Sequence, residues 1–88
     1  MKLTVSVTAD HIERGSAGNG EFCPIALAVR ELVAERSYVS VDQDSMFVRR
    51  PDEDFGFEGE PPESAIDFIN AFDSHNPVEP FTFEVELS

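Results

Sequence analysis

Three side chains of the sequence, His11, Cys23 and His75, are of the types that bind zinc. Protein zinc sites usually contain pairs of ligands only a few residues apart. Here eleven residues separate His11 from Cys23, and fifty-one separate Cys23 from His75. The acidic turn at 42–45 offers oxygen donors, but it lacks the glycine and the final glutamate of a calcium-binding loop. We therefore expect no metal site and no cofactor.

Cysteine chemistry is the second candidate. Cys23 stands where a helix is expected to begin, because Pro24 suits the first helical position. A helix N-terminus lowers the pKa of a thiol, and His11 would be the candidate base. A small cysteine between Phe22 and Pro24 is more typical of a buried apolar position. We therefore expect that the protein is not an enzyme, and an enzyme that uses Cys23 and His11 is the weaker alternative.

Acidic residues dominate the second half of the chain. The sequence has eighteen Asp and Glu against six Lys and Arg, which gives a formal net charge of -12. Residues 51–88 hold eleven of these acids and no Lys or Arg. Six of the eight phenylalanines lie in the same part, which favours a folded acidic surface over a disordered tail. Such a charge disfavours nucleic acid and anionic membranes as partners and favours basic proteins.

The length of 88 residues allows one small domain, residues 1–88, with an acidic C-terminal part over 51–88. A hydrophobic fraction of 41% is sufficient for a core. The single cysteine excludes an internal disulfide. Because the sequence shows no leader peptide and no apolar stretch of about 20 residues, we expect a cytoplasmic location.

Hydrophobic periodicity predicts four strands. A period of two, with one apolar face, runs over residues 3–7 and again over 81–87. Two shorter strands are expected over 37–41 and 45–49, and the polar residues 42–44 between them suit a hairpin turn.

Apolar residues at helical spacing predict two helices, one that begins at Cys23–Pro24 and one over 63–73. Residues 8–14 would make one helical turn, 15–20 a flexible loop and 52–62 a loop with glycine and proline. The order strand, helix, strand, strand, helix, strand predicts an α+β fold of ferredoxin-like order. Its antiparallel sheet would carry both helices on one face and leave the other face open. Another α+β arrangement is the alternative.

The spacing of the acids indicates a binding surface. Glu84 and Glu86 would lie about 6.8 Å apart on one face of a strand, and Glu63 and Asp67 about 6 Å apart on one face of a helix. Rows of carboxylates at such intervals imitate a nucleic-acid backbone and would bind the Arg and Lys residues of a phosphate-binding groove. Aromatic residues in the acidic loop would be apolar anchors. The residues expected to contact the partner are Asp52, Glu53, Asp54, Phe55, Phe57, Glu58, Glu60, Glu63, Asp67, Glu84 and Glu86.

Other interpretations of the charge stay open. The exposed acids would serve only solubility if the two loop phenylalanines covered the core. One Lys against eighteen acids would also suit a high-salt cytoplasm. A structural or assembly subunit that oligomerises through its open sheet face is the alternative of a different class.

The run from Thr8 to Val29 resembles a motif in small uncharacterised proteins of bacteriophages and prophages. The resemblance lies in His11-Ile12-x-x-Gly15 and in Cys23-Pro24-Ile25-Ala26-Leu27-Ala28, and the run spans about a quarter of the chain. Members often carry a second cysteine shortly before the Cys-Pro pair, where this sequence has Gly20-Glu21-Phe22. The resemblance implies no activity. It supplies a context, because compact acidic phage proteins are often inhibitors of host defence or of host nucleic-acid enzymes, among them anti-CRISPR and uracil-glycosylase-inhibitor types.

We therefore expect a phage-type acidic binding protein that inhibits a nucleic-acid-binding host protein by presenting a DNA-mimicking surface. The expected partner is a basic protein or complex in the cytoplasm of a bacterial host, with no direct contact to nucleic acid or membrane. The protein itself would be a monomer or a homodimer.

Overall fold

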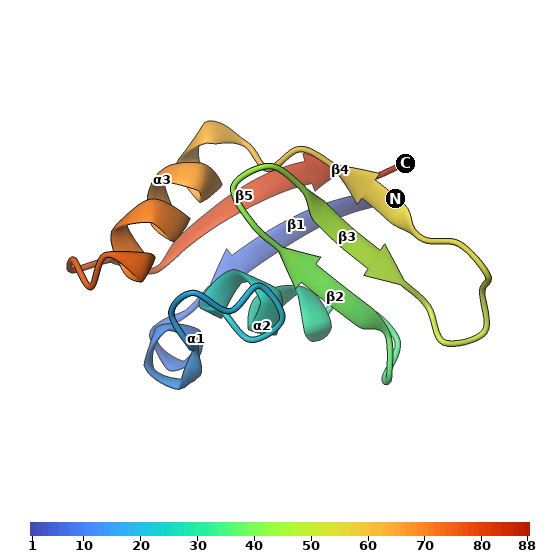
Figure 1. Ribbon diagram of the computed structural model, residues 1–88, viewed down its shortest axis with the longest axis horizontal. Coiled ribbons are helices and arrows are strands. Elements are labelled where there is room, and N and C mark those ends of the chain that lie inside the picture. The colour runs from blue at the N-terminus through green and yellow to red at the C-terminus, as the bar shows by residue number, and fades with distance from the viewer.

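The computed structural model describes residues 1–88 and contains three helices and five strands. None of the helices has the length and apolar composition needed to cross a bilayer. In chain order the elements are β1 (Lys2–Val7), α1 (Ala9–Arg14), α2 (Pro24–Arg30), β2 (Tyr38–Val41), β3 (Met46–Arg49), β4 (Phe57–Gly59), α3 (Glu63–Asp73) and β5 (Phe81–Glu86) (Figure 1).

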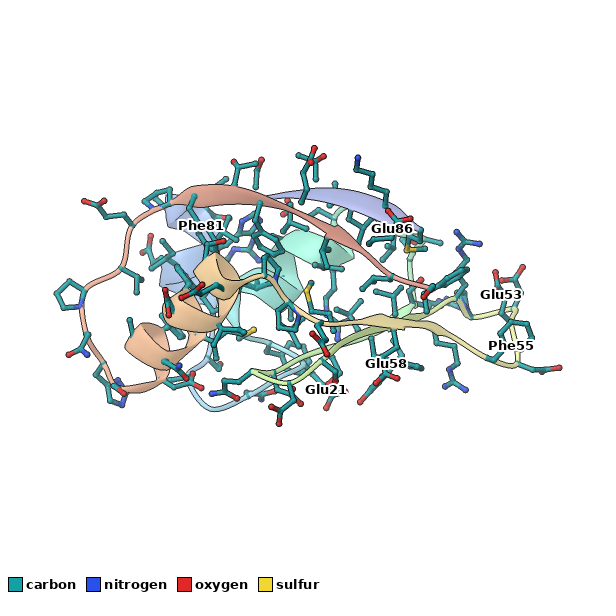
Figure 2. All side chains as sticks on the ribbon, turned by 90° about the horizontal axis from the view of Figure 1, so that it is seen from above. Glu21, Glu53, Phe55, Glu58, Phe81 and Glu86 are labelled. Carbon is teal, nitrogen blue, oxygen red and sulfur yellow. The ribbon has the colours of Figure 1, made fainter.

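The strands form two antiparallel sheets. β1 pairs with β5, with Lys2 opposite Glu86, and β2, β3 and β4 form a three-stranded meander. Figures 1 and 2 show β1 and β5 on one side of the molecule and β2 and β3 on the other. The backbones of Glu58 and Ser88 exchange two hydrogen bonds, of 3.1 and 3.0 Å, so the end of the chain joins the two sheets beside β4.

The core lies between the two sheets. Alternate residues of β1 and β5 point inward, and those of β2 and β3 face them from the other sheet, as the period of two predicts. Val5 and Val39 are fully buried. The inward residues of the strands and of the chain end are Leu3, Val5, Val7, Val39, Val41, Met46, Val48, Phe83, Val85 and Leu87.

Helix α2 contacts β1 and β2 and so completes one side of the core (Figure 1). It begins where Cys23 caps it: the Cys23 Sγ accepts a hydrogen bond from the backbone N–H of Ala26 at 3.4 Å, and Pro24 takes the first helical position. It ends at Arg30, so Leu32, although in phase with the apolar stripe, is exposed.

Helix α3 buries Ala65, Phe68 and Ile69 at helical spacing. The ring of Phe68 stacks on that of Phe81 with centroids 4.9 Å apart, which attaches the helix to β5. The solvent side of the helix therefore carries its polar residues.

The α+β class is confirmed, and strands and helices occur where the apolar periods predict them. The ferredoxin-like order and the placement of two helices on one face are not confirmed, because the strands divide into two sheets and β3 pairs with β4. The prediction of a loop throughout 52–62 is wrong, since β4 lies within it. Gly59 allows this strand to approach the chain end, because a Cβ there would lie 2.5 Å from the carbonyl oxygen of Glu86.

Candidate partner-binding surface

The loop between β3 and β4 carries the first three predicted contact acids. The Arg50 guanidinium lies 2.9 Å from the Glu53 carboxylate, and the Glu53 backbone N–H donates to the Arg50 carbonyl at 3.2 Å. Asp52 and Asp54 are exposed, whereas Glu53 is half-buried. The ion pair thus stabilises the turn, and the carboxylates of Asp52 and Asp54 stay accessible to a partner.

The two loop phenylalanines have different surroundings. Phe55 is 76% exposed, the largest exposed fraction among the large hydrophobic residues. Phe57 is partly buried against the core, and the Arg50 guanidinium lies 5.2 Å from the centre of its ring. Of the two predicted anchors, only Phe55 presents its ring to solvent.

Phe55 borders a hollow of about 400 Å³ on the outer face of the three-stranded sheet. The Tyr38 and Phe47 rings lie edge to face, with centroids 5.9 Å apart and planes at 61°. We define the aromatic hollow by its lining residues, Tyr38, Phe47, Arg49, Asp54, Phe55 and Gly56.

Sequence reasoning identified Asp54 and Phe55 in the aromatic hollow but missed Tyr38, Phe47 and Arg49. The period of two was the available signal, because residues that alternate with buried valines in β2 and β3 must face outward. The sequence does not show that the 50–56 loop returns beside these strands.

The outer side of β4 adds two more acids. Glu58 is exposed at the centre of the strand and lies opposite Phe47 in the register, and Glu60 is exposed just after the strand. Figure 2 shows Glu53 and Phe55 at one end of the molecule and Glu58 on the side of the three-stranded sheet. We define the loop–β4 surface as Asp52, Asp54, Phe55, Glu58 and Glu60.

Glu63 and Asp67 are exposed on α3, one helical turn apart, as predicted. The same helix bears Asn70, whose Oδ1 accepts a hydrogen bond of 3.2 Å from the Nε2 of Gln43 in the β2–β3 turn. This hydrogen bond connects the β2–β3 turn to α3.

Glu84 and Glu86 lie on the outer face of the two-stranded sheet, where the register places Thr4 and Lys2 opposite them. Figure 2 shows Glu86 and Glu58 on opposite sides of the molecule. The predicted contact acids therefore do not form one row. A flat partner surface that meets the loop–β4 surface would not reach the acids of β5.

Few of these acids are neutralised within the chain. The ion pairs join Arg14 to Asp10 and Glu31, His11 to Glu31, and Arg50 to Glu53. Of the nine predicted contact acids, only Glu53 takes part in one. Eight like charges at the surface that form no ion pair in the chain give a field that attracts cationic groups.

His11 has a structural role. Its imidazole is buried, and Nδ1 accepts a hydrogen bond of 2.9 Å from the Thr8 backbone N–H. Because a backbone N–H only donates, Nε2 carries the proton, and it lies 3.0 Å from the Glu31 carboxylate. The Thr8 Oγ1 accepts in turn from the His11 N–H, so the two residues form a capping box that begins α1.

The Cys23 thiol is not activated. Burial raises its pKa above the ordinary 9.0, and the nearby Asp73 carboxylate raises it further, against hydrogen bonds from the Ala26 and Ile25 backbone. At neutral pH the sulfur is therefore a protonated thiol, which is a poor nucleophile. The structure has no cluster of three or more His, Cys, Asp or Glu side chains arranged to hold a metal ion.

Comparisons with models of protein families, with curated proteins and with solved structures gave no match to this chain. The resemblance of the motif from Thr8 to Val29 to phage proteins therefore stays a prediction.

Proposed function

We propose that the protein is a non-enzymatic binding module that engages a basic, nucleic-acid-binding protein through the loop–β4 surface. The observation that supports this function is the set of eight exposed acids without an ion pair in the chain. If the acids served only solubility, an exposed aromatic residue among them would have no role. Phe55 lies among these acids with most of its ring in solvent.

The proposed mechanism is competition for a phosphate-binding groove. The carboxylates of Asp52, Asp54, Glu58 and Glu60 would meet Arg and Lys residues that otherwise contact nucleic-acid phosphates. The association would be fast and salt-sensitive, because unpaired charges steer the approach of an oppositely charged partner and are screened over about 10 Å at 0.1 M salt. Burial of Phe55 would add a contribution that salt does not screen.

The predicted contact acids lie on two sides of the molecule (Figure 2), so we propose that only one group of them imitates a nucleic-acid backbone. The loop–β4 surface combines carboxylates with the exposed aromatic residue, so it is the proposed contact. Glu84 and Glu86 lie on the outer face of the two-stranded sheet, and we propose that they act only through the long-range field.

The biological context follows from the motif that contains His11 and Cys23. We propose a phage or prophage origin, a bacterial cytoplasm as the place of action and a defence or DNA-handling complex as the target. This part of the proposal depends on the resemblance alone.

An assembly subunit is the second candidate function, and one observation favours it. Tyr38, on the outer face of the sheet, and Phe55, in the loop beside it, are 41% and 76% exposed, and exposed aromatic residues are common in interfaces between proteins. In that case the aromatic hollow would be covered by a second copy of the chain. Sedimentation analysis would then show an oligomer that Phe55→Asp dissociates.

The test of the primary proposal is affinity capture from bacterial lysate at low and high salt. The variant removes the four charges of the loop–β4 surface, and the control removes four others. The variant is Asp52→Asn, Asp54→Asn, Glu58→Gln and Glu60→Gln. The control is Glu13→Gln, Glu79→Gln, Glu84→Gln and Glu86→Gln.

The wild type and the control should capture the same basic, nucleic-acid-handling protein, and the loop–β4 variant should lose it. Both variants have the same net charge, so the difference reports position. Equal capture by all three proteins, or no capture by any, would contradict the proposal.

A further inference from the structure

Packing contacts fix the positions of two aromatic rings of the aromatic hollow. A Cβ on Gly56 would lie 2.5 Å from the Phe47 Cζ, so the Phe47 ring lies directly against the loop backbone. The Tyr38 ring meets it edge to face, which is a favourable arrangement of two aromatic rings. Phe55 is the exposed ring at the border of the hollow. Two rings of the site are thus held in place before any ligand arrives.

Two acids lie in or beside the aromatic hollow, against one cation in its lining. Asp54 lines it, Glu58 lies opposite Phe47 in the register, and both carboxylates lack an ion pair. The faces of aromatic rings carry negative electrostatic potential. Arg49 is the one cationic residue of the lining, and it also lacks an ion pair.

Contacts between a guanidinium group and an aromatic ring already occur within the chain. The Arg30 guanidinium lies 5.2 Å from the centre of the Phe22 ring, and that of Arg50 lies 5.2 Å from the centre of the Phe57 ring. No guanidinium or ammonium group of the chain lies over the rings of Tyr38, Phe47 or Phe55. The exposed rings of Tyr38 and Phe55 are therefore free for a cation from outside.

We propose that the aromatic hollow receives an arginine side chain of a basic partner protein. The guanidinium would stack on Phe55 and Tyr38 and donate hydrogen bonds to the Asp54 carboxylate. Arginine suits the site better than lysine, because its planar group stacks on rings while its edge donates hydrogen bonds. The inference rests on the proposed function, since it names the side chain that the loop–β4 surface would select.

The test uses two blocked nonapeptides, one of arginine and one of lysine, titrated by calorimetry into the full chain at one salt concentration. Both peptides carry the same charge, so the acidic field alone would bind them about equally. The arginine peptide should bind more tightly. Phe55→Leu should weaken its binding about three- to fivefold and should weaken binding of the lysine peptide less.

Phe22→Leu is the matched control, because Phe22 is also exposed but does not line the aromatic hollow. It should leave both affinities unchanged. Circular dichroism would verify that each variant keeps the fold, which is expected since both rings are at the surface.

Arg49→Gln tests the sign of the ligand charge. Removal of this cation should strengthen binding of the arginine peptide, and Asp54→Asn should weaken it more than Glu84→Gln does. Weaker binding after Arg49→Gln would overturn the proposal, because it would mean that the aromatic hollow selects an anionic group.

The remaining outcomes separate this inference from the proposed function. Equal binding of both peptides, unaffected by Phe55→Leu, would overturn the arginine site while leaving a basic partner in place. No binding of either peptide would contradict both. Self-association that Phe55→Leu abolishes would assign the aromatic hollow to a second copy of the chain and overturn the proposal.

Discussion

The buried imidazole of His11 lies 3.0 Å from the carboxylate of Glu31 and thereby connects α1 to the residue that follows α2. The other ring nitrogen accepts from the Thr8 backbone. A side chain of a type often used in catalysis is thus occupied on both nitrogens by structural contacts.

His11→Ala should therefore destabilise the protein. The change removes the capping box, the contact with Glu31 and a buried ring, and we expect a loss of about 1 to 3 kcal/mol in the free energy of unfolding. Urea denaturation would measure it. Glu31→Gln should cost less, because the amide oxygen still accepts from Nε2, and Glu35→Gln is the control at an exposed acid outside these contacts. A larger loss for Glu31→Gln than for His11→Ala would show that charge, not capping, dominates.

The buried thiol of Cys23 should make stability fall at alkaline pH. Burial raises the folded-state pKa above the ordinary 9.0, so the unfolded chain loses the proton first as the pH rises. The contribution is fully present below about pH 9 and is lost above it. For this one group, the free energy of unfolding should fall by at most about 1.4 kcal/mol per pH unit.

Cys23→Ser provides the reference for this measurement, because serine caps the helix without ionising in this range. From pH 8 to pH 10 the free energy of unfolding of the wild type should fall relative to that of the variant. A constant difference would contradict the assignment. In the native protein at neutral pH, Cys23 should also react slowly with a thiol reagent.

Gly59→Ala should destabilise the junction between the two sheets. The new methyl group would lie 2.5 Å from the Glu86 carbonyl oxygen and 2.9 Å from the Leu87 Cδ2, so the backbone must move. We expect a cost of about 1 to 3 kcal/mol, measured by urea denaturation. The neighbouring change Glu58→Ala faces solvent and should have little effect, and equal effects at the two positions would argue against the close approach.

Salt should stabilise the protein, because most of its acids form no ion pair in the chain and, at a formal net charge of -12, repel one another. The midpoint of urea denaturation should rise with sodium chloride. The loop–β4 variant, with four fewer charges, should show a smaller rise. An unchanged midpoint in the wild type would mean that the acids are too far apart to interact.

The predicted and observed elements agree best where the apolar period is long. β5 and α3 follow directly from alternation over 81–87 and from the helical stripe over 63–73. β4 has only three residues, one of which is Gly59, and Gly56 precedes it, so no apolar period distinguishes its sequence from that of a loop. Besides its pairing with β3, it exchanges backbone hydrogen bonds with Ser88, thirty residues beyond Glu58, and the missing side chain of Gly59 allows this close approach.

The sequence by itself determined the charge, the class of the fold and the face of each long element that is buried, because these follow from composition and from local period. Only the tertiary structure decided which acids share a surface. It separated Glu58 from Glu86 by placing β4 and β5 in different sheets on opposite sides of the core, and it placed Phe55 beside Tyr38 and Phe47 by returning the 50–56 loop to the strands. These relationships arise from contacts between distant segments, and no local pattern of residues encodes such contacts.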